Sequence, residues 1–259
     1  MIHKTAVIDA AATLGENVSV GPYSVIDAYV VIGDGCTIGP HVQVTGHTEI
    51  GRQCQIHKGA VIGDAPQDIS YDGFVSYTKI GDNSVLREYV TVHRASKPEA
   101  ATVIGKSCML MAFSHVAHDC QIGDHVIIAN QSQIAGHVEI ADRAIISGGV
   151  FVHQFCRIGT MCMIGGAAKI TQDVPPFCLV NHDGKIVSLN AIGLKRNGVS
   201  PEERRKIREA FKEILFGQKP RSQAVKDMAA KYQDTAFFDM FVTFVQTSKR
   251  GIQATISRT

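Results

Sequence analysis

Residues 122–159 read IGDHVIIANQSQIAGHVEIADRAIISGGVFVHQFCRIG, with an aliphatic side chain at every sixth position. The same register extends outward in both directions. It covers residues 2–62, resumes over 80–92 and returns over 104–170, which places 26 aliphatic side chains in one six-residue frame. A repeat this regular indicates a stacked, repetitive architecture.

Small residues complete the pattern. Four positions after most of the aliphatic residues comes Ala, Ser, Thr, Cys or Val, and Gly often follows the aliphatic residue directly, as in Ile122-Gly123 and Ile158-Gly159. Six residues suit a short strand and a turn, and three such units form a triangular coil that stacks on the next at about 4.8 Å. We predict a mainly β fold, a parallel β-helix with the aliphatic residues inside, and we expect these glycines to supply positive φ at the corners.

Two interruptions of the register mark loops. Residues 63–79 and 93–103 lack the repeat, but each gap preserves a multiple of six, so the stack can continue beyond it. We expect both segments to bulge from corners of the β-helix. Loops on a rigid scaffold often carry binding residues.

The repeat ends near Ile170, and beyond it the period becomes helical. Ser200-Pro201-Glu202-Glu203 has a capping Ser, Pro in the first turn and Glu at the capping-box position, so we predict a helix from Pro201 to about Phe216 that stops at Gly217. Further helical sequence contains Phe237, Phe238, Phe241 and Phe244. We interpret these side chains as a packing face in preference to a surface that contacts an acyl chain. The expected domains are a β-helix over 1–184 and a small α-helical domain over 185–259.

Charge is distributed unevenly between these two parts. Residues 1–184 carry 11 Lys and Arg against 17 Asp and Glu, whereas residues 185–259 carry 15 against 7. A basic C-terminal domain predicts an anionic partner. Nucleic acid is disfavoured because neither a nucleic-acid motif nor interleaved aromatic residues accompany the basic ones. The N-terminus lacks the apolar run of a signal peptide, and no stretch reaches the roughly 18 apolar residues that cross a bilayer, so we expect a cytoplasmic protein without stable membrane insertion.

Most cysteines follow the repeat. The small inward position is occupied by Cys36, Cys54, Cys108, Cys120, Cys156 and Cys162. Buried thiols that act as small hydrophobic groups are favoured there over disulfides or a metal site. Cys178 lies outside the register, and the sequence assigns it no role.

Histidines concentrate in consecutive coils, at His115, His118, His137 and His153. Residues 18 apart should stack, so His137 is expected one coil above Asp119, and His153 is expected close to Gly136. A near-neutral imidazole oriented by a carboxylate is the usual composition of a general base. Two alternatives remain at this point: histidines that make only structural hydrogen bonds, and a zinc site of the kind that three histidines form in some β-helix trimers.

The histidine motifs also carry a specific resemblance. They read His115-Val116-Ala117-His118-Asp119-Cys120, Ala135-Gly136-His137 and Val152-His153-Gln154-Phe155, and they are followed by Gln172-Asp173-Val174-Pro175-Pro176, Gly193-Leu194-Lys195-Arg196 and Arg250-Gly251-Ile252. In these motifs the chain resembles the UDP-N-acetylglucosamine O-acyltransferase family over essentially its whole length. The resemblance implies left-handed winding, a homotrimer, and transfer of a (3-hydroxy)fatty acyl group from acyl carrier protein to the 3-position of a UDP-amino sugar in lipid A biosynthesis.

The resemblance further implies a role for each site residue. His118 would be the general base, Asp119 would orient it, and the backbone N–H of Gly136 would stabilise the oxyanion. Residues that would contact the sugar nucleotide or organise its pocket are Asp68, Ser70, His115, His137, His153 and Gln154. Asn190 and Arg196 would contact the nucleotide or the phosphopantetheine arm, and Gly166 would form the floor of the acyl groove. The resemblance implies no metal and no cofactor other than the phosphopantetheine thioester of the co-substrate.

Three positions depart from the family pattern. Ser70 stands where Lys is common, and Ile192 and Asn197 replace a common Glu and Arg near the nucleotide site. These changes leave the base intact, but they leave room for a 3-amino sugar as acceptor, which would give an amide instead of an ester. A zinc-dependent hydratase and a non-catalytic β-helix scaffold are the other hypotheses.

Overall fold

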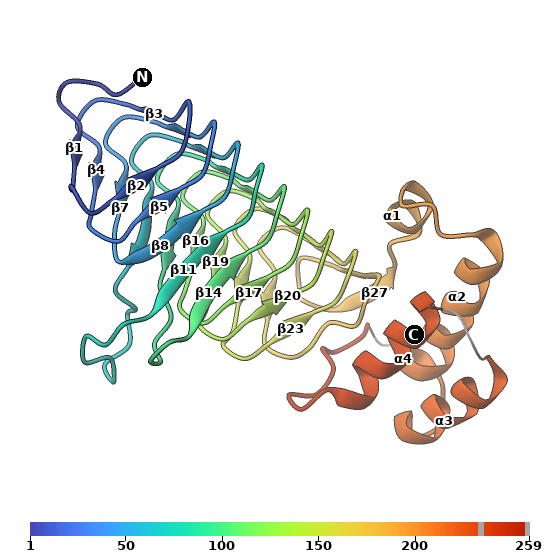
Figure 1. The fold of residues 1–259 in the computed structure, drawn as a ribbon. Helices are drawn as coiled ribbons and strands as arrows, with labels where there is room; N and C mark the ends of the chain where they lie inside the picture. The colour runs from blue at the N-terminus through green and yellow to red at the C-terminus, as the bar shows by residue number, and fades with distance from the viewer. Residues whose placement is uncertain (233–235, 257–259) are drawn as a thin grey trace.

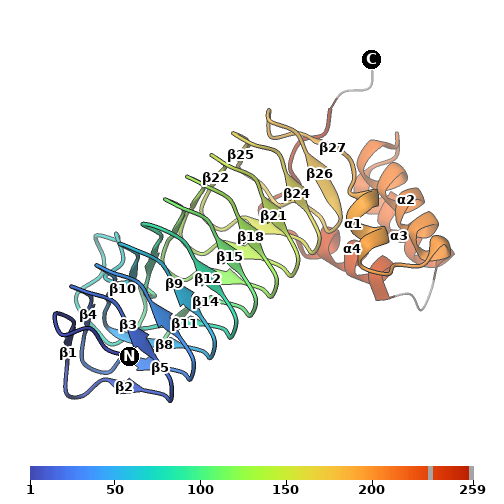
Figure 2. The ribbon, with the colours of Figure 1, turned by 90° about the horizontal axis from the view of Figure 1, so that it is seen from above.

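The chain forms a long prism with a group of helices at one end, far from the N-terminus (Figures 1 and 2). This computed structural model describes residues 1–232 and 236–256. The prism is a left-handed parallel β-helix, as predicted. Its three faces are three sheets, and from β1 to β25 each successive strand along the chain lies in the next face.

The first face, called sheet B, consists of β1 (Val7–Ile8), β4 (Val25–Ile26), β7 (Gln43–Val44), β10 (Val61–Asp64), β13 (Thr91–His93), β16 (His115–Val116), β19 (Gln133–Ile134), β22 (Phe151–Val152) and β25 (Lys169–Ile170). Sheet C consists of β2 (Thr13–Leu14), β5 (Val31–Ile32), β8 (His47–Ile50), β11 (Tyr77–Ile80), β14 (Ala101–Ile104), β17 (Gln121–Ile122), β20 (Glu139–Ile140) and β23 (Arg157–Ile158). Sheet A consists of β3 (Ser19–Val20), β6 (Thr37–Ile38), β9 (Gln55–Ile56), β12 (Val85–Leu86), β15 (Met109–Leu110), β18 (Ile127–Ile128), β21 (Ile145–Ile146), β24 (Met163–Ile164), β26 (Cys178–Val180) and β27 (Ile186–Leu189).

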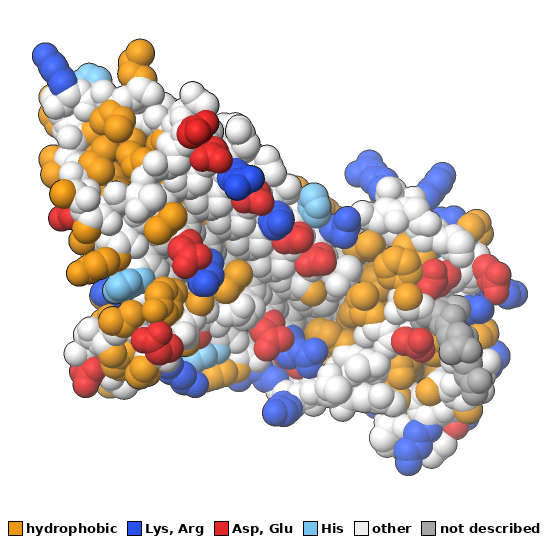
Figure 3. Space-filling model, viewed as in Figure 1, with side chains coloured by type: hydrophobic (Ala, Val, Ile, Leu, Met, Phe, Trp, Pro, Cys, Tyr) orange, Lys and Arg blue, Asp and Glu red, His pale blue; other side chains and the backbone are white. Residues whose placement is uncertain are grey.

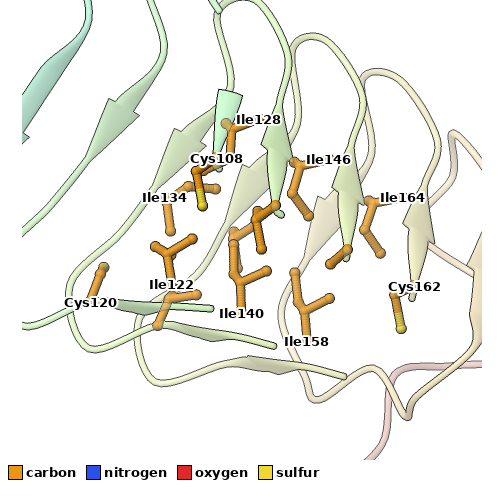
Figure 4. Close-up of a cluster of buried hydrophobic side chains, with 14 of the residues drawn as sticks. Cys108, Cys120, Ile122, Ile128, Ile134, Ile140, Ile146, Ile158, Cys162 and Ile164 are labelled. Atoms are coloured by element: carbon orange, nitrogen blue, oxygen red, sulfur yellow. The ribbon is translucent and has the colours of Figure 1, made fainter. Parts of the chain in front are cut away.

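The predicted aliphatic ladder fills the prism. Ile128, Ile146 and Ile164 are fully buried and point inward from one face, one coil apart (Figure 4). Each such side chain contributes about 1.5–3 kcal/mol by burial. All seven cysteines are free and buried, and for the six that follow the repeat the predicted packing role is confirmed. Cys178 belongs to this set, since it lies inside the last coil, where burial raises the pKa of its thiol.

The glycines that follow the aliphatic residues have a different role from the predicted one. At the corner that contains Gly105, positive φ is found at Ser107 (53°), not at the glycine. A Cβ on Gly105 would lie 2.6 Å from the carbonyl carbon of Gly123 in the next coil, closer than real contacts allow. The prediction of positive φ was therefore wrong, because these glycines are required by the close approach of stacked coils.

Both interruptions of the repeat leave the prism at one corner, the one between sheets B and C. The first loop, residues 65–76, joins β10 to β11, and the second, residues 94–100, joins β13 to β14. They protrude next to each other from the same edge (Figure 1). They are shorter than the predicted 63–79 and 93–103 because the flanking strands extend into both segments. The next coil crosses this corner at His118 and Asp119, so both loops lie beside the predicted base.

In the described part of the chain, four helices follow the β-helix: α1 (Ala191–Arg196), α2 (Pro201–Phe216), α3 (Arg221–Lys231) and α4 (Ala236–Thr247). Helix α2 has the predicted bounds, with Ser200 Oγ accepting a hydrogen bond from Glu203 N (3.1 Å) and Gly217 as its C-cap. The Glu203 carboxylate accepts from Phe237 N (3.1 Å), which ties α2 to α4. The packing role of the phenylalanines is confirmed at Phe238 and Phe241, which are fully buried.

The helical domain is joined to the prism at two places. Strand β27 pairs antiparallel with β26, so residues just beyond 184 still belong to sheet A. After α4 the chain returns to the last coil, where Asp173 pairs with Ile252 and Ile186 with Thr255. Among the described residues, no helix combines the length and apolar character needed to span a bilayer.

Candidate active site

His118 and Asp119 form a hydrogen-bonded pair at the corner between β16 and β17. His118 Nδ1 lies 2.7 Å from Asp119 Oδ2, and both side chains are largely buried. Positive φ at Asp119 (60°) turns its side chain back beside the preceding imidazole. An ionised carboxylate only accepts, so Nδ1 carries the proton and Nε2 is left with its lone pair. This contact is compatible with a general base and its orienting carboxylate, and these roles stay a prediction.

Ser96, on the second loop, supports Asp119. Its backbone N–H and its hydroxyl both donate to Asp119 Oδ2, at 3.0 and 2.7 Å. Burial by itself would raise the pKa of the Asp119 carboxyl, but these hydrogen bonds and that from His118 lower it below its ordinary value. Asp119 is therefore charged near neutrality. Ser96 could not be predicted from the sequence, because it lies in a segment without the repeat, where stacking does not follow from spacing.

Gly136 lies against the His118 ring, one coil on. A Cβ at this position would lie 2.5 Å from Cε1 and 2.7 Å from Nε2 of the imidazole. At the next corner of the prism, the equivalent N–H groups have partners in the following coil. The N–H of Lys106 donates to Asp124 Oδ1, and the N–H of Asp124 donates to Asp142 Oδ1. Within the described residues, the Gly136 N–H makes no hydrogen bond. It is therefore a free donor next to the His118 ring, and its oxyanion role stays a prediction.

Three further histidines surround the pair. His137 Nε2 lies 3.7 Å from Asp119 Oδ2, one coil on as predicted, and its ring stacks on Phe155. His115 Nδ1 lies 2.7 Å from Thr91 Oγ1 and contacts the ring of His93 edge-on. Burial lowers the pKa of His115 to about 4 and lowers the pKa values of His93 and His137 as well. These imidazoles are therefore neutral near pH 7, and they can donate or accept hydrogen bonds without adding charge.

Asp68, on the first loop, reaches over the base. Its Oδ2 lies 4.0 Å from His118 Nε2. Ser70 donates to Asp68 Oδ1 from its backbone N–H (2.9 Å) and its hydroxyl (2.8 Å), and these bonds lower the pKa of the Asp68 carboxyl. Ser70, which stands where Lys is common in the family, therefore holds Asp68 in place.

A cavity of about 340 Å³ opens on sheet B beside the base. Its walls include His115, His118, Gly136, His153, Gln154 and, from the first loop, Gln67. His153 occupies the predicted place next to Gly136. We call this space the acceptor cavity, since the free Nε2 of His118 belongs to its wall.

The remaining predicted residues lie elsewhere in the single chain. Gly166 is at the corner between sheets A and B, where a Cβ would meet only the Gly148 oxygen at 3.4 Å. Asn190 caps α1 by accepting from Gly193 N (2.9 Å), and it donates to Met161 O (2.9 Å). Arg196 is exposed in the last turn of α1. None of these three is among the described residues that line the acceptor cavity.

The two replaced nucleotide-site positions also lie on α1. The Ile192 side chain is exposed, and Asn197 caps the helix by donating from its side chain to Gly193 O (2.9 Å). The structure therefore gives Asn197 a local role in ending the helix.

A metal ion could be held by one atom each from His118, Asp119 and His137, because these atoms all lie within 4.8 Å of one another. However, Asp119 Oδ2 is already the acceptor for His118 and for both donors of Ser96. A zinc ion bound through this oxygen would have to displace these hydrogen bonds. The donor set therefore fits a proton-transfer site better than a zinc site.

A second cavity of about 710 Å³ lies around the corner on sheet C. It extends from Asp119 and His137 to Arg157 and the segment that follows α4. Arg157 crosses its floor, with its guanidinium over the Phe244 ring at 4.4 Å and its Nε 3.4 Å from Glu139 Oε2. Acidic and basic side chains are scattered over this face of the molecule (Figure 3).

The chain is similar to known proteins over nearly its whole length. A family model described as UDP N-acetylglucosamine O-acyltransferase, domain 2, matches residues 173–253, and a bacterial transferase hexapeptide model matches residues 29–64 and 101–136. The chain is 48% identical to the UDP-N-acetylglucosamine O-acyltransferase of Sulfurihydrogenibium sp., with 99% of this chain and 96% of that protein aligned. It is 42% identical to that of Halorhodospira halophila, with coverage of 97% and 98%.

Other relatives align in part or in structure. The enzyme of Synechocystis sp. is 47% identical over 67% of this chain, which spans 63% of that relative's length. The solved UDP-N-acetylglucosamine acyltransferase of Campylobacter jejuni superposes with a TM-score of 0.92 at 34% identity, covering 99% of this chain and all of that one. With this sequence similarity, fold and paired His118 and Asp119, the chain belongs to the UDP-N-acetylglucosamine O-acyltransferase family.

Proposed function

We propose that this acyltransferase moves a (3-hydroxy)fatty acyl group from acyl carrier protein to the 3-hydroxyl of UDP-N-acetylglucosamine, a step of lipid A biosynthesis. The observation that carries the proposal is the free Nε2 of His118, held by Asp119 and lying against Gly136 in the wall of the acceptor cavity. The full name of these relatives, acyl-[acyl-carrier-protein]--UDP-N-acetylglucosamine O-acyltransferase, supplies the two substrates.

In the proposed reaction, His118 Nε2 takes the proton of the sugar 3-hydroxyl as the oxygen attacks the thioester carbonyl carbon. The carbonyl oxygen becomes negatively charged and accepts a hydrogen bond from the Gly136 N–H. The C–S bond then breaks, the ester is formed, and the proton on His118 passes to the departing phosphopantetheine thiolate. No acyl-enzyme is needed, and the negative charge of Asp119 stabilises the imidazolium between the two transfers.

We further infer a homotrimer from the composition of the faces. Sheet A presents apolar side chains outward over five successive coils, at Val85, Met109, Ile127, Ile145 and Met163. The corresponding positions of sheet C are mostly charged or polar, at Lys79, Gln121, Glu139 and Arg157, with Val103 as the one apolar residue among these five. Apolar surface of this extent favours burial against other copies of the chain. A neighbouring subunit would then complete the acceptor cavity and bring its own Asn190 and Arg196 toward it.

The helical domain offers a docking surface for the acidic carrier protein. Exposed basic side chains of α2 and α3 include Arg205, Arg208, Lys212 and Lys226. Charge complementarity of this kind steers association. We place the reaction in the cytoplasm, where such acyl carrier proteins are found.

One assay tests the proposal. Purified enzyme is given a panel of acyl carrier protein thioesters with UDP-N-acetylglucosamine or with its 3-amino analogue. We expect ester formation, and a fall in kcat of at least about 100-fold in His118→Ala, as for the loss of a general base. Retained activity in that variant would refute the role of His118. Exclusive use of the 3-amino sugar would reassign the acceptor.

A further inference from the structure

The segment that follows α4 is locked onto the last coil of the β-helix. Asp173 N–H donates to Gly251 O, and Gln253 N–H donates to Asp173 O, both at 2.8 Å. The Gln253 side chain also accepts from the backbone N–H groups of Thr171 (3.2 Å) and Gln172 (3.0 Å). These bonds hold residues 250–253 in one place, beside residues 171–173, which follow β25.

This anchoring brings Arg250, which itself lines the second cavity, into contact with His153 in the wall of the acceptor cavity. Its Nε–H donates to Thr171 O at 2.7 Å, and one terminal nitrogen of the guanidinium lies 2.8 Å from His153 Nδ1. Arg250 is half-buried, and its guanidinium is therefore held from two sides. His153 is separated from it by 97 residues in the sequence.

The contact decides which nitrogen of His153 carries the proton. A guanidinium has donors and no acceptor, so Nδ1 must accept from Arg250 with its lone pair. Nδ1 also lies 3.3 Å from Gln154 O, which would require the opposite tautomer. The contact with Arg250 is shorter and charge-assisted, so it prevails. Nε2 then carries the hydrogen, on the far edge of the ring.

His153 therefore presents a fixed N–H donor to the cavity that contains His118 and Gly136. Within the described residues, His153 Nε2 makes no hydrogen bond, so this donor is free for a ligand. Oxygen atoms of the sugar nucleotide are the groups it would serve. Without the guanidinium, the ring could rotate and exchange tautomers, and binding would have to order it again.

We infer that Arg250 is a positioning residue of the acceptor cavity, which orients the His153 ring so that its Nε2–H points toward the bound sugar nucleotide. The inference rests on the proposed function. It also gives the C-terminal domain a part in acceptor binding, since the segment beyond α4 supplies the guanidinium.

The experiment compares Arg250→Met with Arg250→Lys, His153→Gln and the double variant Arg250→Met/His153→Gln. Lys249→Met is the matched control, because it removes a positive charge from the neighbouring position without touching His153. We expect Arg250→Met to raise KM for the UDP-sugar by about 3–10-fold, as for one side chain that must be ordered on binding, with kcat changed less. Arg250→Lys should recover part of the loss, and Lys249→Met should match wild type.

The double variant separates positioning from a general structural effect. If Arg250 acts through His153, the double variant binds the sugar no more weakly than His153→Gln alone. Multiplication of the two effects would overturn the inference. Nitrogen-15 NMR of labelled histidine, with the signal of His153 assigned through His153→Gln, should show Nδ1 unprotonated and Nε2 protonated in wild type.

The NMR measurement does not depend on activity. A protonated Nδ1 in neutral His153 of wild type would overturn the inference even if Arg250→Met fails to fold. Absence of acyl transfer by wild type would instead refute the proposed function, and the tautomer of His153 would still test the contact with Arg250.

Discussion

Replacement of Gly136 by Ala tests the close packing on which the proposed base depends. The new Cβ would lie 2.5 Å from Cε1 and 2.7 Å from Nε2 of His118, where ordinary contacts begin at 3.4 Å. The nearest atoms all belong to the His118 ring, so the ring has to retreat by close to 1 Å. That movement lengthens or breaks the 2.7 Å bond from Nδ1 to Asp119. A misplacement of about 1 Å costs about 100-fold in rate, so we expect kcat/KM to fall by that factor.

The assay is acyl transfer to UDP-N-acetylglucosamine, with thermal unfolding measured in parallel. Alanine retains the backbone N–H, so a loss of rate reports displacement of the ring and not the removal of a donor. Gly123→Ala is the matched control, because its Cβ would meet Asp142 Oδ1 at 2.3 Å and Asp142 N at 2.8 Å, at another corner. We expect the control to lower Tm while keeping near-normal kcat/KM. If Gly136→Ala retains wild-type kcat/KM in a folded protein, the proposed dependence on this packing is incorrect.

Two further predictions follow from the charges of the site. Ser96→Ala removes the 2.7 Å hydrogen bond from the Ser96 hydroxyl to Asp119, so the pKa of the Asp119 carboxyl should rise. The acidic limb of the pH–rate profile should then move to higher pH, and kcat should fall by about tenfold. An unchanged profile would contradict the role of Ser96. Burial lowers the pKa of His115 from its ordinary value of 6.5 to about 4, so between these pH values the native state stays unprotonated while the unfolded chain takes up a proton. Stability should therefore decrease as pH falls from 6.5 to 4, by at most about 3 kcal/mol from this residue, and denaturant titrations of His115→Asn should show a smaller decrease.

Much of the architecture could be predicted from local spacing. The six-residue register determines which side chains enter the prism, because each strand and corner uses the same number of residues, and Ile122 through Ile170 all follow it. Three such units make one coil of 18 residues, so residues 18 apart stack, and this rule correctly placed His137 over Asp119. Helix α2 was predictable from its ends alone, since Ser200 and Gly217 act on groups within one turn of the helix.

The sequence by itself determined the β-helix, its inward ladder and the position of the His118 corner, since these depend on a period shorter than one coil. Only the tertiary structure decided that both loops lie at that corner, that Ser96 donates to Asp119, and that Arg250 reaches His153. Loops 65–76 and 94–100 interrupt the regular count, and the C-terminal segment approaches from beyond a helical domain. No periodicity links such residues, because their contacts result from the path of the whole chain in space.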